Sequence, residues 1–329
     1  MAQYDLPLDE LTAYAPTVEE PPDLDAFWDR TLAEARAVGG EARIEPVASG
    51  LTEVVVDDVT FPGFGGHPVK AWLLRPARAT GPLPVVVEFL GYGGGRGLPH
   101  ERLSLAAAGY AHLVMDTRGQ GSTWGSGGDT PDPVGHGPAA PGVLTRGLLD
   151  PHDHYYRRLF TDGVRAVDAV RRIDGIDPGR VAVKGTSQGG GVAIAVAALA
   201  DDVAAALPDV PFLCHVRRAV RITDAFPYAE ITRYLAVHRD HADAAWRTLS
   251  YLDGVNLARR ASAPALFSVA LMDRTCPPST VYAAYNAWGS DGSEPSVQKR
   301  IDVYPYNDHE GGEHYRFTPQ LDWLRRHLG

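Results

Sequence analysis

A strand, a sharp turn and a helix follow one another without a gap in residues 180–200, and this succession constrains the fold more than any other part of the chain. The turn carries a G-x-S-x-G pattern in which Ser187 lies between Gly185 and Gly189. A side chain at either glycine would collide with the backbone that projects the serine hydroxyl. The segment therefore predicts a nucleophile elbow. An ordinary tight turn is the alternative, and the choice depends on an acid and a histidine downstream.

Partners for such a serine follow it in the chain, an acid first and then a histidine, each on a loop after a later strand. Residues 264–271 have the pattern of a buried strand, and Asp273 follows where it ends. Residues 300–306 have the pattern of the next strand, and a polar, glycine-rich loop with His309 follows. An imidazole can take the serine proton, and a carboxylate can orient the imidazole. We therefore predict Ser187, Asp273 and His309 as a catalytic triad.

Other residues compete for both partner positions. Beyond Asp273 the chain has two further histidines, His314 about one helical turn past the strand end and His327 in the closing helix. The order of the elements favours His309 over both. Rival acids lie between strands or inside one, where carboxylates are more often solvated or capping. These acids are Asp224, Asp253 and Asp302.

The oxyanion of a tetrahedral intermediate needs backbone N–H donors, one from the residue after the nucleophile and one from the loop after an early strand. Gln188 follows Ser187, and Tyr92 lies in the glycine-rich loop 91–96 after the strand 84–90. We expect Gln188→Ala to cost little, because the residue contributes its backbone. The loop could instead cradle phosphate, but no register gives G-x-G-x-x-G and no G-x-x-x-x-G-K-[ST] is present.

Four motifs closely resemble those of the acetyl xylan esterase and cephalosporin C deacetylase family of carbohydrate esterases, and the similarity runs from about residue 20 to the end. These motifs are residues 91–96 (GYGGGR), 116–122 (DTRGQGS), 185–190 (GTSQGG) and 309–310 (HE). The resemblance implies the same triad, with Tyr92 and Gln188 as oxyanion donors. It also implies hydrolysis of acetyl esters of short xylo-oligosaccharides and of cephalosporin C, perhydrolase activity, no cofactor and a homohexamer. Residues 290–296 and 311–315 depart from the family pattern.

We expect one α/β-hydrolase domain over residues 1–329, with a mostly parallel central sheet flanked by helices. Strands near residues 52–61 and 68–75 should form its antiparallel start. An N-terminal helical extension covers about residues 1–50, and a cap of about residues 211–260 interrupts the alternation of strands and helices. We place four side chains around the substrate, with plain core packing as the alternative for each. They are Trp124, Phe212, Pro227 and Tyr228.

Arg118 and Gln120 follow another predicted strand, residues 110–116, and so lie at the same edge of the sheet as the elbow. A catalytic role is one interpretation. We favour the other, in which both side chains are buried and hold neighbouring loops through hydrogen bonds.

Composition limits the partners. The formal charge of −10, from 31 basic and 41 acidic residues, is the wrong sign for binding nucleic acid or an anionic membrane. No apolar run reaches the roughly 20 residues of a membrane span, and the first residues lack signal-peptide character, so we expect a cytoplasmic protein. Cys214 and Cys276 suggest no disulfide framework. Residues 152–154 and 238–243 are rich in histidine and aspartate, but neither run has a companion cysteine cluster or an H-E-x-x-H helix, so we expect no metal site.

Two other functions fit parts of the pattern. Thioesterases and peptidases use the same fold and triad, because the triad does not determine which acyl group is transferred or which group leaves. A catalytically inactive relative that binds ligands is the remaining alternative. Peptide and thioester substrates assayed beside acetyl esters separate the first alternative, and the reactivity of Ser187 toward an organophosphate separates the second.

Overall fold

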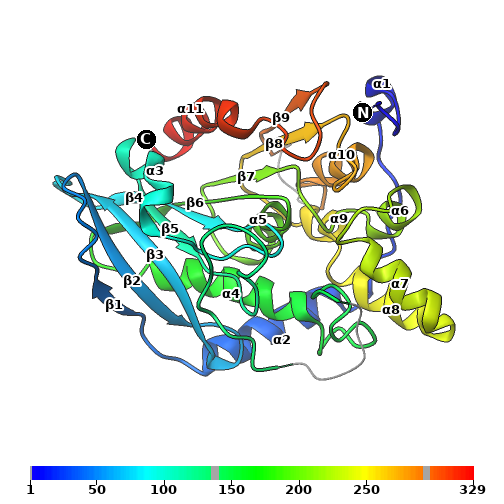
Figure 1. The fold of residues 1–329 in the computed structure, drawn as a ribbon, viewed down its shortest axis with the longest axis horizontal. Helices are drawn as coiled ribbons and strands as arrows, with labels where there is room; N and C mark the ends of the chain where they lie inside the picture. The colour runs from blue at the N-terminus through cyan, green and yellow to red at the C-terminus, as the bar shows by residue number, and fades with distance from the viewer. Residues whose placement is uncertain (1, 135–140, 292–296) are drawn as a thin grey trace.

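The computed structural model describes residues 2–134, 141–291 and 297–329. Its central feature is a nine-stranded sheet with the order β1-β2-β3-β5-β4-β6-β7-β8-β9 (Figure 1). The strands are β1 (Arg43–Pro46), β2 (Val54–Pro62), β3 (Pro68–Pro76), β4 (Leu83–Phe89), β5 (Ala111–Met115), β6 (Ile176–Thr186), β7 (Ala205–Asp209), β8 (Ala265–Ala270) and β9 (Lys299–Tyr304). The strands β5, β4, β6, β7, β8 and β9 run parallel, whereas β1, β2 and β3 are antiparallel. The predicted sheet and its antiparallel start are therefore confirmed.

Helices cover both faces of this sheet. They are α1 (Leu8–Thr12), α2 (Leu24–Ala37), α3 (Ser104–Ala107), α4 (Tyr155–Val170), α5 (Gln188–Leu199), α6 (Val216–Ile222), α7 (Ala229–Val237), α8 (Ala242–Ser250), α9 (Gly254–Ala258), α10 (Pro278–Ala287) and α11 (Phe317–Leu328). Short 3₁₀ segments are η1 (Phe64–Gly66), η2 (Pro99–Arg102), η3 (Arg239–His241) and η4 (Glu313–Arg316). No helix of the described ranges is long and apolar enough to span a membrane.

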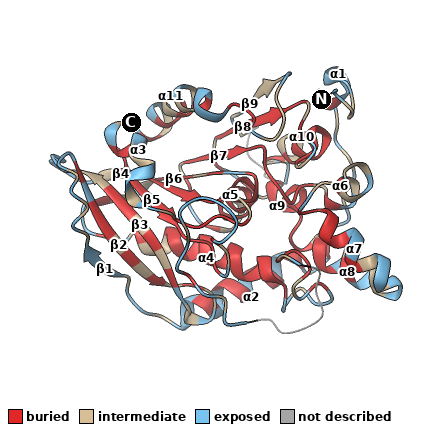
Figure 2. Cartoon of the chain, in the orientation of Figure 1, coloured by how far each residue is buried: buried red, intermediate tan, exposed pale blue. Residues whose placement is uncertain are grey.

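Side chains that alternate along the strands divide the core into two layers. Val85 and Val87 of β4 pack in the larger cluster, with α2, α4, α5 and α10. Val86, between them, faces the opposite side, where α3 and α11 cover the sheet. This period of two is typical of strands that are buried on both faces. Figure 2 shows α4, α5 and the central strands as largely buried.

The N-terminal region packs against the same domain. α2 lies within the predicted N-terminal helical extension, and its Phe27, Trp28 and Leu32 side chains are buried. The Trp28 and Phe160 rings lie 6.0 Å apart, which places α2 against α4. β1 falls inside the predicted extension and pairs with β2.

The segment between β7 and β8, which we predicted as a cap, forms α6, α7, α8 and α9. Figure 1 shows α6, α7 and α8 at one end of the molecule, away from β1 and β2. α9 instead packs beside α5 and α10.

Candidate active site

The strand–turn–helix segment places Ser187 between β6 and α5 with φ 59° and ψ −119°. This conformation is strained for a residue with a side chain, and it projects the hydroxyl from the turn. A Cβ at Gly185 would lie 2.3 Å from the Gly189 carbonyl carbon, and one at Gly189 would lie 2.1 Å from the Phe89 oxygen. Both glycines are therefore required by close backbone approach. The Ser187 N–H donates to the Asp209 carbonyl at 2.9 Å, which ties the turn to β7.

The structure brings the three predicted triad residues together. The Ser187 Oγ and His309 Nε2 atoms lie 2.9 Å apart, and the His309 Nδ1 and Asp273 Oδ2 atoms lie 2.8 Å apart. Asp273 follows β8 and is fully buried, while the His309 side chain, after β9, is 30% exposed. An imidazole with Nδ1–H held by the carboxylate has Nε2 free to take the serine proton.

The acid loop is fixed from two directions. The Asp273 Oδ1 atom accepts hydrogen bonds from the Thr275 and Cys276 N–H groups, each at 2.8 Å. The Tyr4 hydroxyl, from the other end of the chain, donates to the Asp273 carbonyl at 2.8 Å. These contacts leave Oδ2 for the histidine.

Competing acids and histidines have other contacts. Asp253 caps α9 and accepts from the N–H groups of His215, Val216 and Val255. Asp302 pairs with Arg300 and Arg316. The remaining rivals lie apart: Asp224 is exposed before α7, His314 lies in η4 and His327 lies in α11. Within the described ranges, none of these rivals is hydrogen-bonded to Ser187 or His309.

One predicted oxyanion residue shares a pocket with the serine, and the other follows the serine in the chain. Tyr92 lines the same pocket as Ser187, and Gln188 is the first residue of α5. In the described part of the chain, neither backbone N–H has an acceptor. The loop around Tyr92 is held by the Trp124 indole N–H, which donates to the Tyr92 carbonyl at 2.7 Å. Neither N–H group is therefore used by the described part of the fold.

The Gln188 side chain has hydrogen bonds that our expectation of a small effect for Gln188→Ala did not consider. Its Oε1 atom accepts hydrogen bonds from Tyr156 and Gln120, each at 2.9 Å, and its Nε2 donates to the Leu90 carbonyl at 3.2 Å. Gln188 is also buried. The G-x-S-x-G motif indicates only that the residue after the serine contributes a backbone N–H. It does not indicate that the side-chain amide of Gln188 joins two loops.

Arg118 and Gln120 have the loop-holding contacts that we favoured. Gln120 accepts from the Gly93 N–H at 2.6 Å and so links the oxyanion loop to Gln188. Arg118 is fully buried and forms ion pairs with Asp162 and, at 3.2 Å, Asp132.

A pocket of about 470 Å³ opens beside the serine. Two of the four predicted substrate residues line it, Trp124 and Pro227. Trp124 is 47% exposed, so it is not a core anchor. Phe226, which we did not predict, also lines the pocket and is 47% exposed. The sequence that ends at this residue, Thr-Asp-Ala-Phe, contains no motif that would have identified it.

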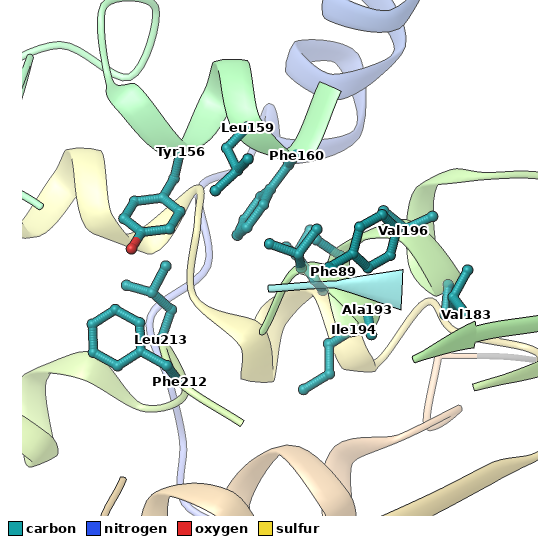
Figure 3. Packing of buried hydrophobic residues seen from close by; sticks show 14 of the residues in the cluster. Phe89, Tyr156, Leu159, Phe160, Val183, Ala193, Ile194, Val196, Phe212 and Leu213 are labelled. Carbon is teal, nitrogen blue, oxygen red and sulfur yellow. The ribbon is translucent and has the colours of Figure 1, made fainter. Parts of the chain in front are cut away.

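Phe212 and Tyr228 do not line this pocket, and their placement around the substrate must be corrected. Both are fully buried, with their ring centroids 4.5 Å apart. Figure 3 shows Phe212 beside Leu213 and facing Tyr156, among other buried side chains. They form core behind the oxyanion loop, because the large apolar area of their rings is withdrawn from water there.

One end of the pocket is charged. Glu88 and Arg102 both line it, with the Arg102 Nη1 and Glu88 Oε1 atoms 2.9 Å apart. Burial disfavours the charge on Glu88, but the cations Lys184 and Arg102, together with His112, hold the pKa of this carboxyl well below its usual value. Sequence reasoning missed this pair because the residues lie in a strand and in η2, outside any motif.

One group of potential metal ligands occurs among the residues that the structure describes. Single ligand atoms of Asp273, Cys276 and His309 all lie within 4.8 Å of one another. The hydrogen bonds to Ser187 and between the histidine and the acid already use both ring nitrogens. Burial also raises the pKa of the Cys276 thiol well above its usual value, and a protonated thiol is a poor metal ligand. The group therefore fits a triad better than a metal centre.

The sheet is mostly parallel, and a strained serine follows one of its strands. An acid and a histidine come later in the chain. Together these features define a hydrolase of the α/β-hydrolase fold. The family model for acetyl xylan esterases (AXE1) matches residues 1–327. The chain therefore belongs to the acetyl xylan esterase family, and it is a carboxylic ester hydrolase that acts on acetyl esters.

Individual relatives agree with this assignment. The structure of an acetyl xylan esterase from Paenibacillus sp. R4 superposes with a TM-score of 0.91 and 36% identity, over 98% of this chain and 100% of that one. Acetyl xylan esterase 1 from Thermoanaerobacterium sp. JW/SL YS485 gives a TM-score of 0.87 and 32% identity, over 98% and 99% of the two chains. Acetyl esterase Axe7A of Xylanibacter ruminicola is 26% identical over 95% of this chain and 69% of its own length.

Proposed function

We propose that the protein removes acetyl groups from short acetylated xylo-oligosaccharides and similar small acetyl esters through an acyl-enzyme on Ser187. The observation that carries this proposal is the hydrogen-bonded series Ser187, His309 and Asp273 at the wall of a pocket. Membership of the acetyl xylan esterase family supports acetyl as the acyl group.

In the first half-reaction, His309 Nε2 takes the proton of Ser187 as Oγ bonds to the acetyl carbonyl carbon. The backbone N–H groups of Tyr92 and Gln188 donate to the oxyanion that forms. Collapse of this intermediate breaks the ester C–O bond, and the alcohol leaves with the proton from His309. A water molecule then attacks the acetyl-serine in the same way, which releases acetate and restores the serine.

The pocket supports a sugar as the leaving alcohol. Its volume of about 470 Å³ exceeds what an acetyl group fills. Trp124 offers an aromatic face for a sugar ring, and Glu88 and Arg102 offer an acceptor and donors for hydroxyl groups. Cephalosporin C fits the same proposal, because attack at its acetyl carbonyl leaves the rest of the molecule unchanged. Hydrogen peroxide in place of water would release peracetic acid, which is the perhydrolase reaction.

The homohexamer and the cytoplasmic location remain proposals that rest on the sequence. Of the two departures from the family pattern, residues 311–315 lie in the loop after His309 and at the start of η4. Most of the other departure, residues 292–296, lies outside the described residues. Sedimentation of the purified protein measures the assembly directly.

The test is acetate release from acetylated xylo-oligosaccharides by the wild type and by Ser187→Ala. Butyryl and octanoyl esters, a peptide and a thioester serve as comparators in the same assay. We expect rapid acetate release that falls steeply with acyl length and that drops by several orders of magnitude in the variant, because a triad acts as a unit. Ser268→Ala, which removes another buried hydroxyl, is the control. Equal rates on longer acyl chains, or an active Ser187→Ala, would contradict the proposal.

A further inference from the structure

The phenol of Tyr92 has no part in the mechanism above, yet it is hydrogen-bonded to a buried carboxylate and to a backbone N–H. The Tyr92 hydroxyl donates to the Glu230 Oε1 atom at 2.5 Å and accepts from the Val143 N–H at 2.6 Å. Glu230 lies on α7, in the segment between β7 and β8, 138 residues further along the chain. The side chain of a proposed oxyanion residue is thus held by a distant helix.

The second oxygen of Glu230 is also occupied. Its Oε2 atom accepts from the Leu144 N–H at 2.9 Å, and the residue is only 1% exposed. The backbone before Val143 closes over the carboxylate, because a Cβ at Gly142 would lie 2.1 Å from Glu230 Oε1. Two acceptor oxygens that each receive a hydrogen bond are what an ionised carboxylate provides. This arrangement of donors therefore suits the ionised form of Glu230.

Three groups leave the Tyr92 residue little freedom. Glu230 holds its phenol, Trp124 holds its carbonyl at 2.7 Å, and Gln120 holds the next N–H, that of Gly93, at 2.6 Å. Of the polar groups of Tyr92 itself, only the N–H has no partner among the described residues. Oxyanion donors are effective only when they are fixed before the charge forms.

We propose that Glu230 is a positioning residue for the hydrolysis, and that it fixes the oxyanion N–H of Tyr92 by holding the tyrosine side chain from α7. This inference rests on the proposed function, in which that N–H stabilises the tetrahedral intermediate. It assigns to the segment between β7 and β8 a part in transition-state stabilisation, in addition to lining the pocket.

The surroundings of Glu230 make this role sensitive to pH. Burial raises the pKa of Glu230 to about 7, although the hydrogen bonds from Tyr92 and Leu144 and the charge of Arg146 lower it. The titratable groups that face it are Tyr92 on the oxyanion loop, Arg146 before α4 and Tyr156 on α4. Protonation turns one acceptor oxygen into a donor, so either the hydrogen bond from Leu144 is weakened or the hydrogen bond between Tyr92 and Glu230 reverses its direction.

The test compares kcat and KM of the wild type, Glu230→Gln and Tyr92→Phe on 4-nitrophenyl acetate from pH 5.5 to 8.5. At pH 8.5 we expect each variant to lose about tenfold in kcat with little change in KM, less than the loss from deleting an oxyanion donor outright. The double variant should be no slower than either single variant, since both remove the same contact. The ratio of wild-type to Glu230→Gln kcat should approach 1 at pH 5.5, where wild-type Glu230 is itself protonated.

A matched control exists elsewhere in the molecule. The Tyr251 hydroxyl donates to Asp23 Oδ1 at 2.5 Å, so Tyr251→Phe removes the same kind of contact. We expect it to leave kcat unchanged at every pH. Two results would overturn the inference. One is a Glu230→Gln variant with wild-type kcat at every pH, and the other is a ratio of wild-type to Glu230→Gln kcat that does not change with pH. An active Ser187→Ala in the same assay would instead contradict the proposed function. If Glu230→Gln does not fold, the pH series on Tyr92→Phe decides.

Discussion

The side-chain amides of Gln120 and Gln188 meet at 2.9 Å, although 68 residues separate them in the chain. Gln188 follows the nucleophile, and Gln120 also accepts from the Gly93 N–H in the oxyanion loop. One amide pair thus sets the distance between the two loops that carry the proposed oxyanion donors.

Gln188→Ala should therefore lower kcat by about 10- to 100-fold, since it releases both loops and leaves the buried Tyr156 hydroxyl without its acceptor. Gln188→Glu keeps the acceptor and should lose less. The exposed Gln298→Ala is the control. Steady-state kinetics on 4-nitrophenyl acetate provides the measurement, and a Gln188→Ala variant with wild-type kcat would show that the amide pair does not control the donors.

Phe226→Ala should widen the pocket and raise the rate on butyryl esters relative to acetyl esters by about tenfold, because a pocket wall separates acyl chains that differ by a methylene by about 1–3 kcal/mol. The control is Val237→Ala, which removes a 72% exposed apolar side chain from α7. Comparison of kcat/KM for the two esters measures the effect. An unchanged ratio would place the acyl group elsewhere in the pocket.

Arg102→Met should raise KM for acetylated xylo-oligosaccharides several-fold and leave KM for 4-nitrophenyl acetate unchanged, because it removes donors from the charged end of the pocket. The variant also removes a partner of Glu88, so its melting temperature must be measured beside its kinetics. Equal changes of KM on both substrates would argue against a sugar site at this end.

Acid should destabilise the protein partly through His154. This residue is fully buried, accepts from the Tyr156 N–H at the start of α4 and lies 3.0 Å from the Leu144 carbonyl through Nε2. Burial lowers its pKa to about 3, so below pH 6.5 the unfolded chain binds a proton that the folded chain does not. The stability contributed by neutral His154 is thus complete above pH 6.5 and is lost as the pH falls.

His154→Asn keeps an N-cap acceptor but removes the titration. Between pH 7 and pH 5 we expect the wild type to lose about 2 kcal/mol more unfolding free energy than this variant. Urea titrations at the two pH values measure the difference. Parallel losses in both proteins would show that His154 carries none of the acid sensitivity.

Sequence reasoning located the sheet and the three triad positions because both depend on local patterns. A run of apolar residues marks β4, β5 and β8, and chain order decides which loop carries the acid and which the histidine, so Asp273 and His309 could be chosen before any contact was seen. Phe212 and Tyr228 could not be assigned in the same way. Whether an aromatic ring in a long segment between strands faces core or pocket depends on packing between distant helices, and no periodicity records it.

The contact between Glu230 and Tyr92 also could not be predicted from the sequence. Neither residue forms a motif with the other, and the carboxylate acquires its partners only when α7 and residues 143–144 meet. From the sequence alone, we expect a single glutamate in a helix to be solvated. Its burial is a consequence of the tertiary fold.

The hydrogen bond from Tyr4 to the Asp273 carbonyl has a consequence for biosynthesis. Tyr4 supports the acid loop, and His309 is translated after both Tyr4 and Asp273, so the triad cannot form on the ribosome before His309 has been made and has docked. Nascent chains that stop before His309 should therefore show no esterase activity.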